Sequence, residues 1–199
     1  MPHDPQIVFH ESRNLDEHVA LIKQQVDRSV RDPELRALTL KVAAGKADEW
    51  VIDPHTGERI PIAIAWGEQF RLPVVSACGM KDAVCESQAI WNFAVLNIRY
   101  VLDPDGFDLF STAKYTLLAN AGDCDDFVIV LCAMHRLLGF AGCAARVVTT
   151  DARHWEHIYA LVGFPKSRPT QWVPLDPTVA GVAPGWQYNK TQRWVDYRM

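Results

Sequence analysis

The sequence lacks a long apolar run, a block of positive charge, an internal repeat and any low-complexity segment. A transmembrane helix needs about 18 or more consecutive apolar residues, so we expect no membrane-spanning helix. With 20 Lys and Arg against 24 Asp and Glu, the formal net charge is −4. A nucleic-acid-binding domain is usually basic. We therefore expect neither nucleic acid nor a membrane as a partner.

Cysteine pairs of the metal-binding or redox kind are also missing. The five cysteines include no C-x-x-C pair, and no Cys/His pair follows Cys78 and Cys85 at zinc-finger spacing, so we expect no metal site there. The first 14 residues lack the charged and then apolar pattern of a signal peptide, which favours a cytoplasmic location. An odd number of cysteines in that compartment favours free thiols. We expect no cofactor.

The chain otherwise has the composition of an ordinary globular protein, with 199 residues, 49% hydrophobic and 22% charged. Residues 15–31 place apolar side chains at spacings of three and four, which predicts an amphipathic helix capped by Asn14. A second helix is expected to end near Gly45, and short strand-like pieces flank a turn at residues 53–59. We interpret residues 1–75 as an N-terminal helical and hairpin extension and residues 76–199 as the core domain.

The core predicts two more helices followed by strands. Residues 82–102 and 125–138 have helical spacing, and the stretch between 107 and 120 is expected to be a loop. Strand-like runs follow at residues 144–150, 157–162 and 171–175. Helices followed by consecutive strands favour an α+β fold with an antiparallel sheet.

Cys124 stands at the start of the predicted helix that begins near Asp125. A helix N-terminus carries partial positive charge and free N–H groups, which lower the pKa of a thiol. Gly122 allows a sharp turn into the helix. Asp123, Asp125 and Asp126 suit a helix start, but their charges oppose a thiolate. A catalytic thiol here would therefore need a cation beside it.

Two structural interpretations of this stretch remain open. Taken alone, Cys124 is most simply a structural thiol. The three carboxylates beside it are also compatible with a calcium or magnesium cluster. The stretch lacks the glycine turn and closing glutamate of an EF-hand loop, which argues against that cluster.

A histidine beside the thiol would supply the cation and act as a base. His135 lies three turns along the same helix and cannot reach Cys124. His154 and His157 remain, and we prefer His157 because it opens a strongly patterned strand. Asp176 ends the next strand, where its carboxylate can orient the imidazole. We predict a triad in which Cys124 is the nucleophile, His157 the base and Asp176 the orienting acid.

Three stretches of the chain, residues 121–148, 154–162 and 172–181, resemble in sequence and order the transglutaminase-like branch of the papain-type thiol enzymes. The resemblance covers about residues 85–182. It implies a papain-like core, with the nucleophile helix packed on an antiparallel sheet, and the same triad. Residues 97–110 are similar to forms encoded in bacteriophages and prophages, which implies host cytoplasm or virion as the location and adds phage structural proteins to the expected partners.

One departure from the family pattern concerns the neighbours of the cysteine. Animal transglutaminases have glutamine before the cysteine and tryptophan after it, whereas this chain has Asp123 and Asp125. Amide hydrolysis is therefore expected as readily as crosslinking.

The oxyanion hole is expected to use the backbone N–H of Cys124 and one donor from upstream. The candidates are Gln88, Trp91 and Tyr115, and we prefer Tyr115 because it lies in the stretch before the nucleophile. Trp155 and Trp172 flank the predicted triad and are candidates for lining a substrate cleft, although tryptophan more often belongs to the core.

Two classes of function follow. In the first, the protein is a cysteine-dependent acyl-transfer enzyme that acts on peptide or side-chain amides, as a protease, amidase or transglutaminase-like enzyme. In the second, the fold is a catalytically idle module that serves as a phage structural or assembly protein.

Overall fold

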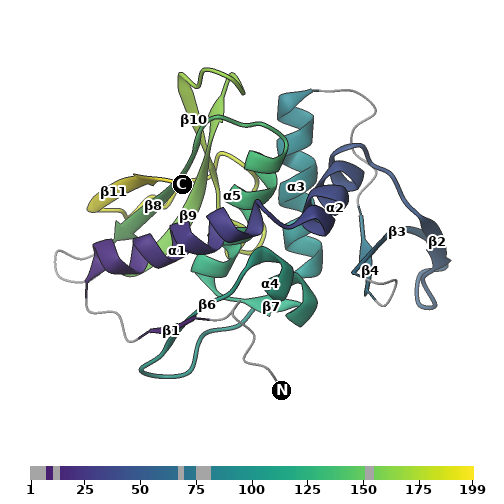
Figure 1. Ribbon diagram of the computed structural model, residues 1–199, viewed down its shortest axis with the longest axis horizontal. Coiled ribbons are helices and arrows are strands. Elements are labelled where there is room, and N and C mark those ends of the chain that lie inside the picture. Colours follow the sequence, from purple (N-terminus) through teal and green to yellow (C-terminus); the bar gives the residue numbers. More distant parts are fainter. Residues whose placement is uncertain (1–7, 11–13, 67–69, 75–81, 151–154) are drawn as a thin grey trace.

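The computed structural model describes residues 8–10, 14–66, 70–74, 82–150 and 155–199 (Figure 1). The helices are α1 (Leu15–Ser29), α2 (Pro33–Ala43), α3 (Ala83–Asn97), α4 (Ala113–Ala119) and α5 (Cys124–Leu137). The strands are β1 (Val8–His10), β2 (Glu49–Ile52), β3 (Arg59–Ala65), β4 (Phe70–Pro73), β5 (Arg99–Tyr100), β6 (Asp108–Phe110), β7 (Ala121–Gly122), β8 (Cys143–Thr149), β9 (His157–Phe164), β10 (Gln171–Leu175) and β11 (Arg193–Arg198). The predicted α+β class is confirmed, while the specifically papain-like arrangement stays a prediction.

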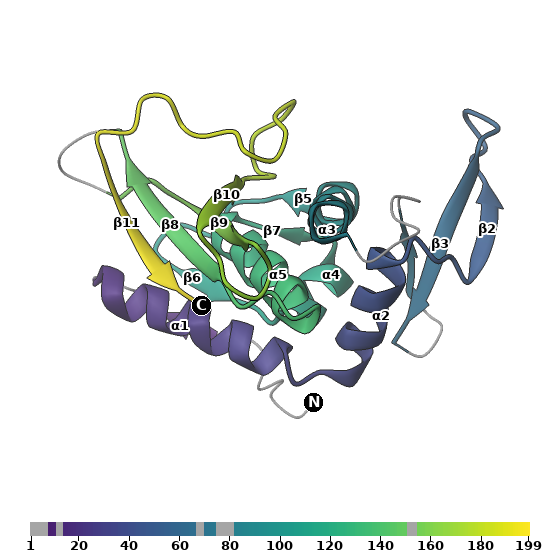
Figure 2. The same ribbon diagram turned by 90° about the horizontal axis from the view of Figure 1, so that it is seen from above.

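Helix α5 is the central element of the molecule. It packs against α1, α2, α3 and α4 and against strands β8 and β9 (Figure 2). Its residues from Asp125 to Met134 are all buried, because a helix that is apolar on every side is stable only when other elements surround it. The helix that carries Cys124 is therefore held rigidly from several directions.

The main sheet has the strand order β10-β9-β8-β11 and is antiparallel throughout. One face of β9 presents Ile158, Ala160 and Val162 to the core that includes α5, and the other face presents Tyr159 and Leu161 to a small second cluster. Leu175 at the end of β10 pairs with Ala160 of β9. The end of β10 therefore lies beside the start of β9, which is where His157 stands.

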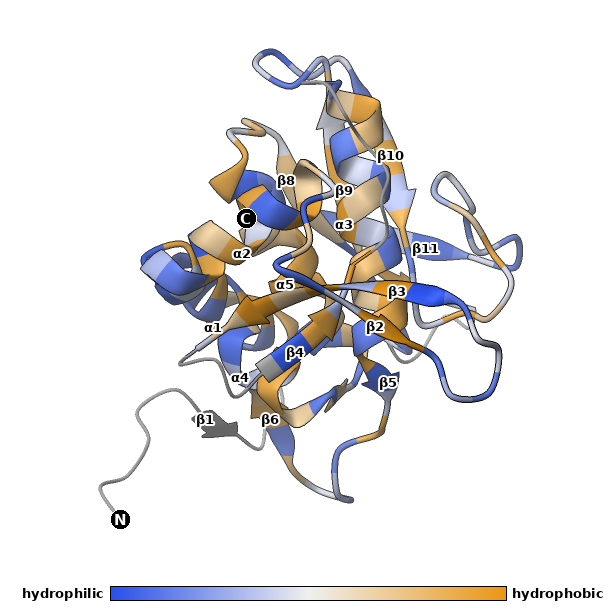
Figure 3. Cartoon of the chain, turned by 90° about the vertical axis from the view of Figure 1, so that its right-hand side faces the viewer, coloured by the Kyte–Doolittle hydropathy of each residue, from blue (hydrophilic) through white to orange (hydrophobic). Residues whose placement is uncertain are grey.

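The N-terminal helices join the same core as α5. Helix α1 buries Ile22 and Val26 completely, and both belong to the cluster that contains the α5 side chains. A hydrogen bond of 2.8 Å from the Asp53 N–H to the Glu58 carbonyl closes the hairpin between β2 and β3. The sheet of β2, β3 and β4 lies beyond α2 and α3, away from the main sheet, and Figure 3 shows it from its outer side. The boundary near residue 75 stays a prediction.

Three expectations about local structure in the core are corrected. The helix expected over 82–102 ends at Asn97, because Ile98 is extended and β5 then pairs in parallel with β7. The expected loop between 107 and 120 contains β6 and the short helix α4, which Thr112 caps. Strand β11 was not expected, and it completes the sheet by pairing with β8.

The cysteines also differ from expectation. Cys85 is disulfide-bonded, so the expectation of free thiols is wrong for this residue. Cys124, Cys132 and Cys143 are free, and the last two are buried. Cys78 lies outside the described residues. Within the described ranges, the structure contains no helix that is both long and apolar enough to cross a bilayer.

Candidate active site

Cys124 is the first residue of α5 and is partly exposed. Asp123 caps the helix, since its side chain accepts a hydrogen bond of 3.2 Å from the Asp125 N–H. Strand β7 leads into this helix start through Gly122. A Cβ atom at Gly122 would lie only 2.6 Å from the Cβ of Asp126, so the close approach of β7 and α5 requires glycine there. The local sequence therefore places the Cys124 sulfur at the N-terminus of the rigidly packed helix α5.

His157 and Asp176 are in direct contact. The Nε2 atom of His157 lies 2.7 Å from Oδ2 of Asp176, whose side chain is only 1% exposed. The hydroxyl of Thr178 donates a hydrogen bond of 2.6 Å to the other carboxylate oxygen of Asp176. Both carboxylate oxygens are therefore held, which fixes the orientation of the carboxylate toward the imidazole. The Asp-Pro-Thr sequence at residues 176–178 could have predicted this hydrogen bond, because a threonine two residues after an aspartate commonly forms a hydrogen bond with the aspartate side chain.

The sulfur of Cys124 lies near the start of the strand that carries His157. The backbone N–H groups of Ile158 and of Cys124 itself are close enough to the sulfur to lower the pKa of the thiol. The structure shows no hydrogen bond between the Cys124 sulfur and the His157 ring, although both residues are described. Because Nε2 contacts Asp176, Nδ1 is the ring nitrogen that remains for a proton from the thiol. The link between thiol and imidazole stays a prediction.

Burial and charge both act against a free thiolate at this position. Burial raises the pKa of the Cys124 thiol well above its ordinary value, and the neighbouring carboxylates of Asp125 and Asp123 raise it further. The same burial raises the pKa of these carboxyls, to about 7 for Asp125, about 8 for Asp126 and about 9 for Asp123. Near neutral pH these carboxyls therefore retain much of their protonation, and they oppose the thiolate less than three full charges would.

His18 of α1 contacts this acidic group, which the sequence alone did not reveal. Its Nε2 atom lies 3.2 Å from Oδ2 of Asp125, and its Nδ1 atom lies 3.5 Å from Oδ2 of Asp108 on β6. Burial lowers the pKa of His18, while the charges of Asp108 and Asp123 raise it. The N-terminal helix thus supplies a polar contact to the residue that follows the predicted nucleophile.

Tyr100 is a second residue near the predicted nucleophile that the sequence did not single out. It lies in β5 and pairs with Gly122 of β7, two residues before Cys124. Burial first, and then the charges of groups that include Cys124 and Asp176, raise the pKa of Tyr100 to about 12. Its hydroxyl therefore keeps its proton across the neutral range and can donate a hydrogen bond.

The other oxyanion candidates lie on α3 and α4. Tyr115 is in the first turn of α4, and its N–H faces the hydroxyl of Thr112. On α3, the Gln88 amide donates to the Asn92 side chain at 2.9 Å, and the indole N–H of Trp91 is buried without a hydrogen-bond partner. The oxyanion role of these residues stays a prediction.

Two aromatic rings lie near His157, and neither belongs to the predicted cleft residues. The rings of Tyr159 and Tyr188 each lie 6.0 Å from the His157 ring, and Trp186 packs edge-on against Tyr188 at 5.4 Å. The predicted cleft residue Trp172 packs on the small cluster around Tyr159 and Leu161. The segment between β10 and β11 thus brings the Tyr188 ring close to His157, with Trp186 packed against Tyr188.

Trp155, the other predicted cleft residue, lies just before His157. It packs partly against the main core, and the guanidinium of Arg193 lies 4.9 Å from the centre of its ring. The cleft roles of Trp155 and Trp172 remain predictions.

His135, one of the alternative histidines, does not enter the predicted site. His135 is buried within α5 and bonds to the Leu131 carbonyl at 2.7 Å and to the Ser87 hydroxyl at 2.9 Å. Burial lowers the pKa of His135 to about 4, so it is a neutral core histidine. His154 lies outside the described residues.

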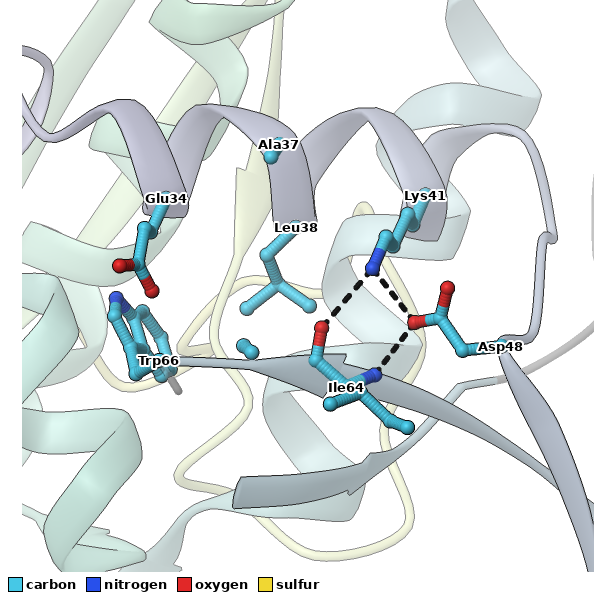
Figure 4. Close-up of a pocket in the computed structure, with 8 residues that line it drawn as sticks. Glu34, Ala37, Leu38, Lys41, Asp48, Ile64 and Trp66 are labelled. Carbon is cyan, nitrogen blue, oxygen red and sulfur yellow. Dashed lines mark hydrogen bonds and ion pairs between the residues drawn. The ribbon is translucent and has the colours of Figure 1, made fainter. Parts of the chain in front are cut away.

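A cavity of about 400 Å³ lies between α2 and β3, and the predicted triad does not line it (Figure 4). The Lys41 ammonium at one end donates to Asp48 at 2.6 Å and to the Ile64 carbonyl at 3.0 Å, and Glu34 and Trp66 stand at the other end. Within the described ranges, no group of three or more His, Cys, Asp or Glu side chains is placed to hold a metal ion. This finding covers the carboxylates beside Cys124.

Comparison with known proteins gives a single family. The family model described as the transglutaminase-like superfamily matches residues 74–177, which is more than half of the chain. No curated protein and no solved structure matches the chain significantly. The matched region contains all three predicted triad residues.

Proposed function

The chain belongs to the transglutaminase-like superfamily, and from this premise we propose that it is a cysteine-dependent acyl-transfer enzyme acting on peptide or side-chain amides. Cys124 is the nucleophile, His157 the base and Asp176 the orienting acid. The observation that carries the proposal is the contact of 2.7 Å between His157 and the buried Asp176, next to a helix that begins with a cysteine.

The reaction begins with transfer of the Cys124 thiol proton to Nδ1 of His157. The sulfur attacks the carbonyl carbon of the amide, and the negative charge moves to the carbonyl oxygen. The backbone N–H of Cys124 at the helix start is one donor for that oxygen. The Tyr100 hydroxyl, which stays protonated, is our candidate for the second donor, beside the Tyr115 predicted from sequence.

Collapse of this intermediate breaks the C–N bond. The imidazolium of His157 returns its proton to the departing amine, and an acyl thioester remains on Cys124. Water or a primary amine then attacks the thioester while His157 accepts the proton of the attacking group. Water releases a carboxylic acid and an amine releases a new amide, and in both cases the thiol is restored.

The raised pKa of the thiol is compatible with this mechanism because the proton moves directly to the imidazole. A catalytic thiol does not need to be ionised in the resting protein if its base is within reach. Asp176 then stabilises the imidazolium that forms. The protons that the neighbouring carboxyls retain lower the electrostatic cost of forming the thiolate of Cys124 beside the imidazolium of His157.

A labelling experiment tests the assignment of the nucleophile. The protein is treated with iodoacetamide at pH 6, and modification of each cysteine is followed by peptide mass spectrometry. We expect Cys124 to react faster than Cys132 and Cys143, and His157→Ala to slow Cys124 at least tenfold. The matched control is His55→Ala, an exposed histidine in the β2–β3 turn, which should leave the rate unchanged. Equal rates for all three thiols would overturn the proposal.

A second experiment distinguishes the two acceptors. The protein is incubated with casein and a fluorescent alkylamine. Incorporation of the amine that is lost in Cys124→Ala indicates transamidation. New amino termini or released ammonia, without incorporation, indicate hydrolysis.

Two observations favour the alternative function, an idle module with a structural or phage-assembly role. The thiol pKa is raised, and no hydrogen bond joins the sulfur to the imidazole. The labelling experiment separates the two functions, because an idle module should show slow modification of Cys124 that His157→Ala does not change.

A further inference from the structure

Residues 95–102 form an apolar surface segment. Val95, Leu96, Tyr100, Val101 and Leu102 are 45, 52, 45, 46 and 72% exposed, so five of eight consecutive residues present large apolar side chains to solvent. Scattered apolar residues on a surface need no explanation, but their concentration in one short segment makes it a candidate interaction site.

This segment runs from the end of α3 along β5 to a point beside the predicted nucleophile. The N–H of Val101 donates to the Gly122 carbonyl at 3.0 Å, and Cys124 follows two residues after Gly122. Tyr100 lies in this segment, and its pKa is raised by burial first and then by charges that include that of Cys124. The segment therefore passes close to the start of α5, where Cys124 stands.

The backbone of β5 offers an open edge at the same place. The N–H groups of Arg99 and Val101 both point to the β7 side, where they donate to Asn120 and Gly122. In a parallel pair the residue between them directs its N–H and carbonyl to the opposite edge, and that residue is Tyr100. No strand among the described residues pairs with this edge. An extended polypeptide commonly binds to such an edge.

We propose that residues 95–102 bind an extended, apolar segment of a polypeptide substrate and present its amide to Cys124. This proposal rests on the proposed function, and it narrows the substrate class from amides in general to unfolded or extended protein segments. Strand β5 of the segment pairs with β7, which leads into Cys124. A bound polypeptide would therefore lie beside the predicted nucleophile, which favours a substrate over a second copy of the chain.

Binding of an unfolded polypeptide tests the proposal directly. The probe is reduced, carbamidomethylated lysozyme, which is a basic and unfolded chain with apolar segments. Its affinity is measured by fluorescence anisotropy for the Cys124→Ala protein, so that no turnover occurs. Leu102→Asp in this background should weaken binding at least about tenfold, because an apolar contact is replaced by a hydrated charge.

The matched control is Ile52→Asp, which makes a similar chemical change at an exposed position, 66% accessible, on β2. Figure 2 shows β2 separated from β5 by α3. The control should change the dissociation constant by less than twofold. Since the added negative charge alone would favour a basic probe, weaker binding in Leu102→Asp cannot come from charge attraction. A second variant, Leu102→Ser, removes the apolar contact without a charge and should also weaken binding.

The outcomes separate this proposal from the proposed function. Equal affinities for the two Asp variants, or no binding by the Cys124→Ala protein, would overturn the proposal that residues 95–102 bind substrate. Iodoacetamide is too small to need the segment, and Leu102→Ser adds no charge near the thiol, so Cys124 in Leu102→Ser should be alkylated at the rate of the unmutated protein. If binding depends on Leu102 but Cys124 is unreactive, the result would support residues 95–102 as a binding segment and overturn the proposed enzymatic function.

Discussion

Replacement of Asp176 by Asn tests the one triad contact that the structure shows directly. The amide has nearly the size of the carboxylate, so the buried site should keep its shape. The charge-assisted hydrogen bond of 2.7 Å to His157 is lost. Hydrogen bonds to charged groups contribute about 1.5–3 kcal/mol. At about 1.4 kcal/mol per factor of ten in rate, this loss alone slows the reaction about 10- to 150-fold.

A second effect of Asp176→Asn acts on the protonation of the imidazole. The Asn amide can donate a hydrogen bond to Nε2 of His157, which an aspartate cannot. The ring proton then sits on Nδ1, the nitrogen that remains for a proton from the thiol, and the base is blocked. The equivalent change in a serine protease triad costs about 10⁴ in rate. We therefore expect a loss between about tenfold and about 10⁴-fold.

The assay for Asp176→Asn combines amine incorporation into casein with the alkylation rate of Cys124 at pH 6. Asp105→Asn is the control, because Asp105 is exposed and lies outside the triad. Circular dichroism confirms that both variants fold. A folded Asp176→Asn protein that keeps both rates within twofold of the unmutated protein would refute the role of this contact.

Three further predictions concern stability and the oxyanion. Burial raises the pKa of Asp126 from 3.8 to about 8, so the folded protein binds more protons than the unfolded chain between these values. Stability should fall as pH rises through this window, and calorimetry should show a smaller fall of Tm from pH 5 to pH 9 in Asp126→Asn. Leu131→Ala, at a fully buried position of α5, should lower the free energy of unfolding in urea by about 2–5 kcal/mol. Tyr100→Phe should lower kcat for casein at least tenfold. It should hardly change the alkylation of Cys124, because alkylation forms no oxyanion. Tyr115→Phe should leave kcat unchanged, and the reverse result would identify Tyr115 as the donor.

The elements with strong internal patterns could be predicted from the sequence. Helix α5 and strands β8, β9 and β10 correspond to the predicted runs, because their apolar spacing reflects burial in the core. The contact between His157 and Asp176 followed from that strand order, since adjacent antiparallel strands bring the start of one beside the end of the other.

The features that depend on distant pairing could not be predicted. Helix α3 ends at Asn97 because β5 pairs with β7, about twenty residues further along the chain. The edge strand β11 has mostly exposed residues and exists because it pairs with β8. The contact between His18 and Asp125 joins positions more than a hundred residues apart, and no local pattern contains it.

The acidic residues around Cys124 make a further prediction about how its reactivity depends on pH. For an isolated thiol below its pKa, the alkylation rate rises tenfold per pH unit. Here the pKa of Asp125 is about 7 and that of Asp123 about 9, so both carboxyls lose their protons over the range in which alkylation is measured. Each new negative charge raises the pKa of the thiol. The slope of log rate against pH should therefore stay below one between pH 6 and pH 9.

Asp125→Asn removes one of these charges and should bring the slope closer to one. It should also raise the alkylation rate at pH 9, where the unmutated carboxyl is ionised. The matched control is Asp105→Asn, whose carboxyl is exposed and should leave the slope unchanged. A unit slope in the unmutated protein would show that the carboxyls do not influence the thiol, and the acidic residues would then serve only to start the helix.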